Sequence, residues 1–502
     1  MEPITFDDFQ SLASSGYNVI PLHQTLQLDR ETPVSLFDRF RNRAIFLLES
    51  AAMGDATGRY SFIGLDRRWR ITANDSGVSA TGVTVEPSQS PLRALRSVLQ
   101  SYKSFIPEGL PDFTGGAVGF VTYDYVRRIE RLPRPSETNQ WPDIDFSFAS
   151  AVLICDHLRH STTVVVNAFT DETPLEESYA NAKHALEDIV ATLLAGAPAT
   201  DPVVERLVAT APSLRETVQV REIAASISNF SLEEYCAVVE RAKEYIFAGD
   251  IFQVVPSQQF RQPSNVDPLT LYRVLRSLNP SPYMYLLDSG DSQIVGASPE
   301  MLMRVHNGVV STRPIAGTRP RGADEIQDQQ LEHDLLHDEK EISEHVMLVD
   351  LGRNDVGRVA EPGSVQVERL AKIERFSHLM HLVSQVDGTL RDDLDAFDAF
   401  DAIFPAGTLT GAPKVRAMEI IDEFEPVRRG PYGGAVGYFA LSGNADFAIT
   451  IRTVSLRNGF ATVQAGGGVV ADSRPESEYQ ECISKASAPL TALAIAEGST
   501  SS

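Results

Sequence analysis

The stretch DEKEISEHVMLVDLGRND, residues 338–355, is the segment on which the interpretation of this chain depends. Its spacing predicts a helix that runs into a loop. Glu341 and Glu344 are three residues apart, so a helix places them at neighbouring positions of one face while the apolar residues between them face a core. Because charged side chains normally stay in solvent, this spacing alone leaves a solvated helix face as the alternative.

A second acidic pair with the same spacing lies near the C-terminus. Glu478 and Glu481 repeat the E-x-x-E pattern, and Lys485 follows one turn later. Four carboxylates brought together repel one another unless they are protonated or neutralised by a cation. A hard divalent cation such as Mg²⁺ suits carboxylates, waters and a bound anionic substrate. The spacing does not show that the two helices meet.

Composition limits the classes of protein to consider. The chain has 502 residues, enough for two or three domains or one large two-layer enzyme, with 43% hydrophobic and 22% charged residues as in ordinary globular proteins. The formal net charge of −24 argues against nucleic acid and anionic membranes as partners, because both reward basic surfaces.

The cysteines and the start of the chain predict a cytoplasmic protein. Cys155, Cys236 and Cys482 have neither metal-binding nor redox spacing, which is typical of reduced thiols. The first residues, MEPITFDDFQ, lack the basic and apolar regions of a signal peptide. The sequence contains no apolar run long enough to span a bilayer.

The order of predicted elements favours an α+β fold with antiparallel sheets over a doubly wound one, since helices and strands do not alternate steadily. We expect an N-terminal part over residues 1–215, which ends in a linker at 195–215 rich in Ala, Pro and Thr. A C-terminal catalytic part is expected over 216–495, followed by a disordered tail at 496–502. Ser231 and Glu234 form a predicted capping box, and Gly249 is expected to end that helix.

Three glycine-containing stretches indicate close backbone approach or anion binding. RPIAGTRPRG (313–322) combines a glycine with a threonine and two arginines, and FPAGTLTGAPK (404–414) is a tight loop expected to open a helix at its end. QAGGGV (464–469) is a glycine-rich bend. Each of these stretches taken singly is also compatible with a structural turn.

Two further residues are candidates for chemistry. Arg452 lies in the otherwise apolar run AITIRTV, which predicts a strand, and a buried arginine there needs an anionic partner. His381 lies among apolar residues, where a histidine is more often a satisfied core group. If it lies in the pocket, it is the best candidate for a general acid or base.

Taken together, these motifs resemble the chorismate-utilising enzymes, and among them the large-subunit (component I) family of anthranilate synthases. The resemblance covers the chain from AIFLLES at residue 44 to ECISKA at 481–486, with RPIAGTRPRG, EKEISEHVMLVDLGRND, FPAGTLTGAPKVRAME and QAGGGVVADS in the family's order. It implies a two-layer sandwich of two antiparallel sheets with helices outside.

The resemblance also implies a reaction and residue roles. Ammonia adds at C2 of chorismate as the C4 hydroxyl leaves, and pyruvate is then eliminated to give anthranilate, the first step of tryptophan biosynthesis. The family's roles place Mg²⁺ on Glu344 and Glu481, with Glu341 and Glu478 in support. The implied substrate contacts are Gly317, Thr318, Tyr432, Arg452, Gly466, Gly467, Gly468 and Lys485. Thr408 is implied as a contact near the ring, and His381 as the residue assisting proton removal or pyruvate departure.

Two positions distinguish branches of the family on chemical grounds. Water-using relatives have a lysine base where this chain has Gln253, and glutamine cannot deprotonate water, whereas ammonia needs no such activation. The large subunit of aminodeoxychorismate synthase often has a lysine where this chain has Ala316, so direct attack by ammonia is the simpler expectation here.

A regulatory site and a partner are implied in the same way. Glu49 and Ser50, with Pro282, Tyr283 and Met284, match the family's tryptophan site, so feedback inhibition by L-tryptophan is expected, with plain core packing as the alternative for Tyr283 and Met284. The chain has no glutaminase arrangement of Cys, His and Glu. Ammonia from a separate glutamine amidotransferase subunit is therefore expected, in a heterotetramer of two large and two small subunits.

Two other functions stay open from the sequence. One is component I of aminodeoxychorismate synthase, which releases a non-aromatic amino product and no pyruvate. The other is a catalytically silent, tryptophan-sensing regulatory protein that keeps only the fold. The presence of all four glutamates together with Lys485 and His381 argues against the silent protein.

Overall fold

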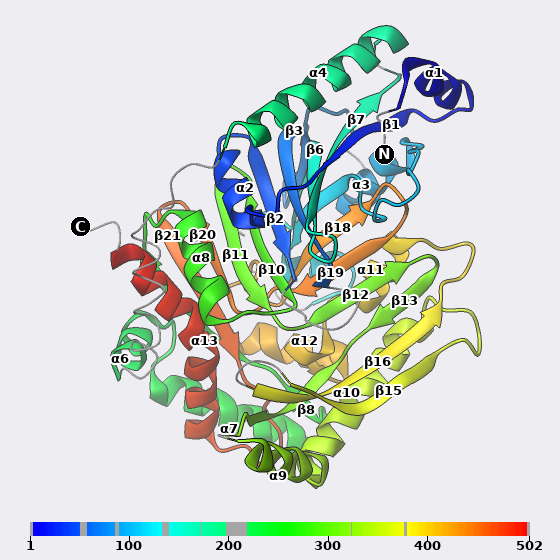
Figure 1. Cartoon of the computed structure of the whole chain (residues 1–502). Helices are drawn as coiled ribbons and strands as arrows, with labels where there is room; N and C mark the ends of the chain where they lie inside the picture. The colour runs from blue at the N-terminus through cyan, green and yellow to red at the C-terminus, as the bar shows by residue number, and fades with distance from the viewer. Residues whose placement is uncertain are drawn as a thin grey trace.

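Antiparallel strand pairing joins the two halves of the chain (Figure 1). The computed structural model describes residues 4–50, 58–85, 90–132, 140–171, 173–196, 218–322, 324–375 and 379–498. Within these residues, hydrogen bonds connect nineteen strands into one curled sheet, and β8 and β17 form a separate two-stranded ribbon. The N-terminal strands β2 and β5 pair with the C-terminal strands β10 and β18. The predicted linker lies almost wholly outside the described residues.

Helices and strands alternate irregularly along both halves. The N-terminal elements are α1 Phe6–Ser14, β1 Val19–Leu26, α2 Pro33–Arg39, β2 Ala44–Glu49, β3 Tyr60–Asn74, β4 Gly77–Thr81, α3 Pro91–Gln100, β5 Gly116–Val121, η2 Tyr123–Arg128, β6 Ile144–Asp156, β7 Ser161–Phe169 and α4 Leu175–Leu194. The next are α6 Val218–Ile227, α7 Leu232–Ala248, β8 Gln253–Val254, β9 Ser257–Pro263, α8 Pro268–Leu278, β10 Tyr283–Asp288, β11 Ser292–Ser298, β12 Met301–His306, β13 Val309–Thr312, β14 Ile315–Pro320, α9 Glu325–Leu336 and α10 Glu339–Gly357. The last are β15 Gln366–Arg375, β16 Leu379–Thr389, α11 Ala396–Ile403, η3 Gly407–Leu409, β17 Gly411–Ala412, α12 Lys414–Phe424, β18 Ala435–Ala440, β19 Ala445–Ile449, β20 Thr453–Arg457, β21 Phe460–Gly466 and α13 Pro475–Gly498.

The predicted fold class is confirmed at its coarser level. Every pairing between two of the named strands is antiparallel, and helices cover the sheet rather than alternating with parallel strands. The finer expectation of two separate sheets is not confirmed, because the hydrogen-bonded connections run without a break from N-terminal to C-terminal strands. Among the described helices, none has both the length and the apolar composition to cross a membrane.

Local sequence signals set several helix boundaries. Helix α7 begins after Ser231, whose side chain accepts from the Glu234 amide in the predicted capping box, and it ends at Gly249, which has a left-handed φ of 82°. Helix α10 extends further than predicted, since the stretch 338–355 was expected to run into a loop, whereas the helix continues to Gly357. Helix α13 runs to Gly498, so residues 496–498 of the expected tail are helical, and residues 499–502 lie outside the described part.

Packing brings the two acidic helices to one end of the molecule. In Figure 1, α7, α9, α10 and α13 gather at the end of the sheet opposite α1 and α4. Helix α10 packs on β14 and β16, and α13 packs on α7 and β21. Because β14 and β21 belong to the same sheet, its curvature can bring the inner faces of α10 and α13 to a common cavity.

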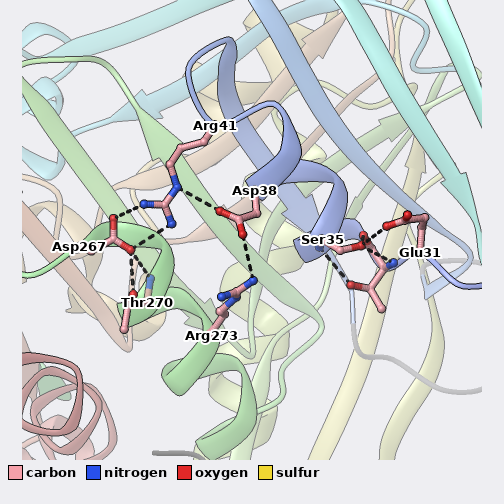
Figure 2. A network of polar contacts seen from close by, with 8 residues as sticks. Glu31, Ser35, Asp38, Arg41, Asp267, Thr270 and Arg273 are labelled. Atoms are coloured by element: carbon pink, nitrogen blue, oxygen red, sulfur yellow. Dashed lines mark hydrogen bonds and ion pairs between the residues drawn. The ribbon is translucent and has the colours of Figure 1, made fainter. Parts of the chain in front are cut away.

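A network of charged residues fastens the N-terminal helix α2 to the C-terminal helix α8 (Figure 2). Arg41 pairs with Asp267 at 3.0 Å, and Arg273 pairs with Asp38 at 3.5 Å. Asp267 is also the N-cap of α8, where its carboxylate accepts from the Thr270 amide at 2.9 Å. The start of α8 is therefore fixed against the N-terminal part of the chain.

Candidate active site

The two E-x-x-E pairs line one cavity of about 660 Å³. Glu341 and Glu344 come from α10, and Glu478 and Glu481 come from α13. The sequence could not show that these helices meet, and the structure places them on either side of the same cavity. Most of the other predicted catalytic and substrate residues line it too, namely Gln253, Gly317, Thr318, His381, Thr408, Tyr432, Arg452, Gly466, Gly468 and Lys485.

Helix α10 presents its two carboxylates in different environments. Glu344 accepts a hydrogen bond from Gln253 Nε2 at 2.9 Å, and its pKa is raised by burial, with further repulsion from Glu341 and Glu481. Glu341 pairs with Arg319 at 3.2 Å and lies beside Gly317, where a β-carbon would come 3.2 Å from Glu341 Oε2. The repulsion at Glu344 shows that carboxylates from both helices act on one another.

Helix α13 presents one buried and one half-exposed carboxylate. Glu478 is buried, and its Oε2 has no hydrogen-bond partner among the residues that the structure describes. Burial raises the pKa of Glu478, with a contribution from the nearby Glu481. Glu481 pairs with Lys485 at 2.7 Å, and Lys485 Nζ donates to the Gly466 carbonyl at 3.1 Å. Lys485 thus ties α13 to the end of β21.

The glycine bend after β21 leaves room beside these carboxylates. A β-carbon at Gly467 would lie 2.7 Å from Glu478 Oε2, and one at Gly468 would lie 2.5 Å from Gln253 Nε2 and 3.8 Å from Glu344 Oε1. A side chain at either position would displace the end of the Glu478 or Gln253 side chain. Gly467 itself does not line the cavity, so its predicted role as a direct substrate contact is less direct than expected, whereas the space it leaves lies next to Glu478.

The donor set fits a hard cation, although the described residues contain no preformed cluster of three or more His, Cys, Asp or Glu at metal-binding distances. A divalent cation would give the unpartnered oxygen of Glu478 a partner and would offset the mutual repulsion of the carboxylates. The absence of side chains at Gly467 and Gly468 leaves space beside these carboxylates. Oxygen ligands of this kind suit Mg²⁺ better than softer metals.

His381 lies in the cavity as a neutral imidazole. Burial, followed by the nearby Arg452, lowers its pKa to about 4. Its Nδ1 lies 3.3 Å from the Gly317 carbonyl and 3.0 Å from Thr318 Oγ1. When the proton is on Nδ1 and serves the carbonyl, the lone pair of the neutral ring is on Nε2. The residue is therefore suited to accept a proton and not to donate one at neutral pH.

Sequence reasoning missed Glu300, the most perturbed carboxyl group in the cavity. It lies in the turn between β11 and β12, is fully buried, and accepts a hydrogen bond from Thr408 Oγ1 at 2.9 Å. Burial raises its pKa to about 7. An acidic residue within the apolar run VGASPEMLM, residues 295–303, is the signal that could have identified it.

Arg452 lies in a different place from the one predicted. It lies between β19 and β20 and not within a strand, with a left-handed φ of 50°. Its guanidinium is buried, which lowers its pKa, and it donates to Asn279 Oδ1 at 3.4 Å. Asn279 also lines the cavity and was not predicted. The hydrogen-bond acceptor of Arg452 is a neutral amide, and the nearby Glu300 acts on it only through charge, so the guanidinium can still pair with a substrate carboxylate.

The two arginines of RPIAGTRPRG are already paired with protein carboxylates. Arg319 contacts Asp338 at 2.7 Å as well as Glu341, and Arg321 contacts Asp328 at 2.7 Å. The suggestion that both guanidinium groups bind an external anion is therefore not supported. Gly317, with a left-handed φ of 63°, and Thr318 remain at the cavity wall.

The residues predicted to bind tryptophan come together at the pairing of β2 with β10. Glu49 is opposite Met284 in this ladder, and Ser50, Pro282 and Tyr283 adjoin the pair. The Glu49 carboxylate is buried and contacts Tyr272 Oη at 2.5 Å and Arg276 at 3.1 Å. Tyr283 donates to Asp446 at 3.1 Å. Residues 51–57, which follow Ser50, are outside the described part.

Comparisons with known proteins agree with this geometry. Residues 44–491 match the family of chorismate binding enzymes. The anthranilate synthase component 1 of Acetivibrio thermocellus is 46% identical over 97% of this chain and 98% of its own length. The protein of the same name from Pseudomonas aeruginosa is 46% identical over 98% and 99%, and that of Mycolicibacterium smegmatis is 47% identical over 99% and 94%.

Solved structures show the same fold. The crystal structure of anthranilate synthase component I from Streptococcus pneumoniae TIGR4 superposes with a TM-score of 0.72 at 38% identity, over 88% of this chain and 94% of that one. The menaquinone-specific isochorismate synthase from Escherichia coli superposes with a TM-score of 0.69 over 97% and 98%, but at 19% identity it supports the fold alone.

Proposed function

This chain belongs to the chorismate-binding enzyme family and matches anthranilate synthase component 1 chains over nearly its whole length, and we propose that it converts chorismate and ammonia into anthranilate, pyruvate and water. The observation that carries the proposal is the meeting of both E-x-x-E pairs, Gln253 and a partly protonated Glu300 in one cavity.

The first half of the reaction forms a C–N bond and breaks a C–O bond. Ammonia attacks C2 of chorismate, the ring double bond shifts, and the C4 hydroxyl leaves as water. Glu300 can supply the proton that the departing hydroxyl needs, because its raised pKa keeps a population of the acid form near neutral pH. Thr408 donates to one oxygen of Glu300, which leaves the other oxygen to carry the proton.

The second half removes the proton from C2 and expels the enolpyruvyl arm as pyruvate, so that the ring becomes aromatic. A neutral His381 can accept the C2 proton at Nε2 while Nδ1–H is held by the Gly317 carbonyl. Gln253 cannot act as a base, and ammonia, which carries its own lone pair, does not require one. The amide of Gln253 instead holds Glu344 in place.

Substrate binding uses the two charged ends of the cavity. Arg452 is the buried cation suited to the carboxylate of the enolpyruvyl arm. Mg²⁺, held by Glu344 and Glu481 with Glu341 and Glu478 in support, would bind the ring carboxylate and polarise the departing hydroxyl. Lys485 pairs with Glu481 and orients it toward the cavity.

Nitrogen is proposed to come from a separate glutamine amidotransferase subunit. A glutaminase needs a thiolate nucleophile, and burial raises the pKa of all three thiols, Cys155, Cys236 and Cys482. Two of them are buried. We propose two subunits of each kind in the complete enzyme, as expected from the family, and free ammonia as an alternative nitrogen source at alkaline pH.

L-Tryptophan is proposed to inhibit the enzyme at the β2–β10 site. The buried Glu49 carboxylate offers a partner for the ligand's ammonium group, and Met284 and Tyr283 offer apolar surface for its ring. The site is distinct from the active-site cavity, since none of the five predicted tryptophan residues lines that cavity.

Anthranilate fluorescence tests the proposal directly. The purified chain is incubated with chorismate, Mg²⁺ and ammonium at alkaline pH, with and without EDTA and tryptophan. The expected result is fluorescence with an equal yield of pyruvate, abolished by EDTA and suppressed by tryptophan. Consumption of chorismate without pyruvate would identify aminodeoxychorismate chemistry instead. An absence of any consumption would contradict enzymatic function.

A further inference from the structure

A second cavity, of about 400 Å³, lies behind the active site and has a polar wall. We call it the rear chamber. On one face of strands β9, β20 and β21, the side chains of Phe260, Val454 and Val463 pack in an apolar core. Their alternate residues face the chamber, and these are Thr453, Ser455, Gln259, Thr462 and Gln464. An inner sheet face of uncharged polar side chains is unusual, because such faces normally pack dry.

These polar side chains form a continuous row across the strands. Ser455 is directly opposite Thr462, and Gln259 is directly opposite Gln464. The opposite wall includes Tyr123, whose side chain is only 4% exposed. Its hydroxyl has no hydrogen-bond partner within the described part of the chain. A buried hydroxyl of this kind calls for a small polar occupant in the chamber.

The rear chamber and the active-site cavity share two wall residues, Tyr432 and Gln464. Gln464 Nε2 donates to Ser257 Oγ at 2.8 Å, and Ser257 Oγ donates to Glu425 at 2.7 Å. Glu425 in turn pairs with the buried Arg429 at 2.6 Å. The partition between the two cavities is therefore a thin layer of hydrogen-bonded side chains and not a packed core.

The three carboxylates of the chamber already have partners. Asp422 pairs with Arg127, Glu425 pairs with Arg429, and Asp124 accepts from the Gly430 amide at 2.9 Å. The lining also includes Arg261 and Arg428, so its four arginines outnumber its three carboxylates, and the chamber would not favour an ammonium ion. A small neutral molecule that donates and accepts hydrogen bonds fits the lining better than an ion does.

The active-site cavity is open to solvent at Glu481 and Lys485, whose side chains are 46% and 47% exposed. In the proposed reaction, chorismate and its cation would occupy this side, so a nucleophile arriving later needs another approach. From these relations, and on the basis of the proposed function, we propose that ammonia reaches the active-site cavity through the rear chamber and past the partition at Tyr432 and Gln464.

The test fills the chamber without touching the proposed catalytic groups. Ser455→Phe and Thr462→Phe place a ring in the middle of the chamber, and Thr462 is the more exposed of the two, so its variant is expected to fold if the first does not. Ser455→Ala and Thr462→Ala are the matched small variants. Thr81→Phe, on the exposed edge strand β4, controls for added aromatic bulk.

Two nitrogen sources are compared by steady-state kinetics: ammonium with the chain alone, and glutamine with the amidotransferase subunit bound. The expected result for the phenylalanine variants is at least a fivefold rise in KM for ammonia and a similar fall in the glutamine-dependent rate. For the phenylalanine variants, KM for chorismate should stay within about twofold of the unmodified value. For the Ala variants and Thr81→Phe, KM for ammonia and the glutamine-dependent rate should also stay within about twofold.

Either nitrogen source remaining unaffected in a folded phenylalanine variant would overturn the route. An equal loss of kcat/KM for chorismate would also overturn it, since that indicates a distorted active site. Anthranilate production by the unmodified chain is measured in the same assay, so failure of the route is separable from failure of the proposed function.

Discussion

Arg452 donates a hydrogen bond to Asn279 Oδ1 at 3.4 Å, at the wall of the active-site cavity. Asn279 is the C-cap of α8, and Arg276, three residues earlier on that helix, pairs with Glu49 at 3.1 Å. The C-terminal end of α8 therefore contacts a proposed substrate residue and the proposed tryptophan site at once. A ligand that moves this helix end when it binds at one site would therefore change the affinity of the other site for its own ligand.

Replacing Asn279 tests this coupling. Asn279→Ala removes the contact with Arg452 and leaves Glu49 and Arg276 in place. We expect tryptophan to bind with a Kd within about threefold of the unmodified value, while its effect on KM for chorismate falls by about fivefold or more, within the usual range of allosteric coupling. Calorimetry gives the Kd, and kinetics at saturating tryptophan give the effect. Unchanged inhibition at unchanged Kd would rule out this helix end as the link.

Glu49→Gln tests the tryptophan site itself. Removing the buried charge deprives the ligand's ammonium group of its partner, so Kd for tryptophan should rise by about tenfold or more, which corresponds to about 1.4 kcal/mol. Ser50→Phe should act sterically in the same direction. Glu31→Gln, in an ion pair with Arg39 on α2, is the matched control outside the site. A Ser50→Phe enzyme that keeps both activity and full tryptophan sensitivity would show that tryptophan binds elsewhere.

Glu300→Gln should abolish proton donation to the departing hydroxyl. General acid catalysis contributes roughly 10²- to 10⁴-fold, so kcat should fall within that range. At a fixed concentration of free ammonia, kcat of the unmodified chain should decline as pH rises through about 7, where Glu300 loses its proton. The variant should lack this limb. A variant with nearly full activity, or one that keeps the limb, would assign the acid role to another group.

The same substitution predicts a pH-dependent gain in stability. Burial raises the folded-state pKa of Glu300 from 4.5 to about 7, so the folded protein binds more protons than the unfolded chain between these values. Its stability therefore decreases as pH rises from 4.5 to 7, by about 3 kcal/mol in total. Glu300→Gln should be more stable than the unmodified chain at pH 8 by up to that amount and should show little gain at pH 4. Urea unfolding at the two pH values measures the difference, and an equal difference at both would contradict the assignment.

His381→Asn should separate the two halves of the reaction. Asparagine keeps a hydrogen bond to the Gly317 carbonyl but cannot accept the C2 proton, so chorismate loss should exceed anthranilate and pyruvate formation. Because the His381 pKa is about 4, the unmodified chain should show no activity limb near 6.5 from this residue. Coupled assays of chorismate, pyruvate and anthranilate give the ratio. Equal losses of all three would show that His381 acts before the amination.

Local patterns were sufficient for helix α7 and for the chemical types of the predicted site residues. The capping box at Ser231 and Glu234 and the stop at Gly249 set α7, since these depend on backbone groups within a few residues. The E-x-x-E spacing placed each glutamate pair on one helix face for the same reason.

Long-range packing decided the remaining features. Arg452 was expected in a strand because its neighbours are apolar, yet the chain turns there with a left-handed φ, which hydrophobicity does not encode. The continuous sheet through β2–β10 and β5–β18 follows from pairings between residues more than 200 positions apart, and no local signal specifies such partners. The predicted separation into two sheets was not confirmed for this reason.

The sequence by itself determined which residues this protein brings to its chemistry: four glutamates at helical spacing, a glutamine where water-using relatives have a lysine, and a histidine among apolar residues. Only the tertiary structure decided the protonation states and contacts of the site residues, including Glu300, which sequence reasoning missed. Burial keeps Glu300 partly protonated and His381 neutral, and the curled sheet brings α10 and α13 to one cavity. The physical reason is that a pKa and a contact both depend on the surrounding low-dielectric packing, which is built from residues distant in sequence.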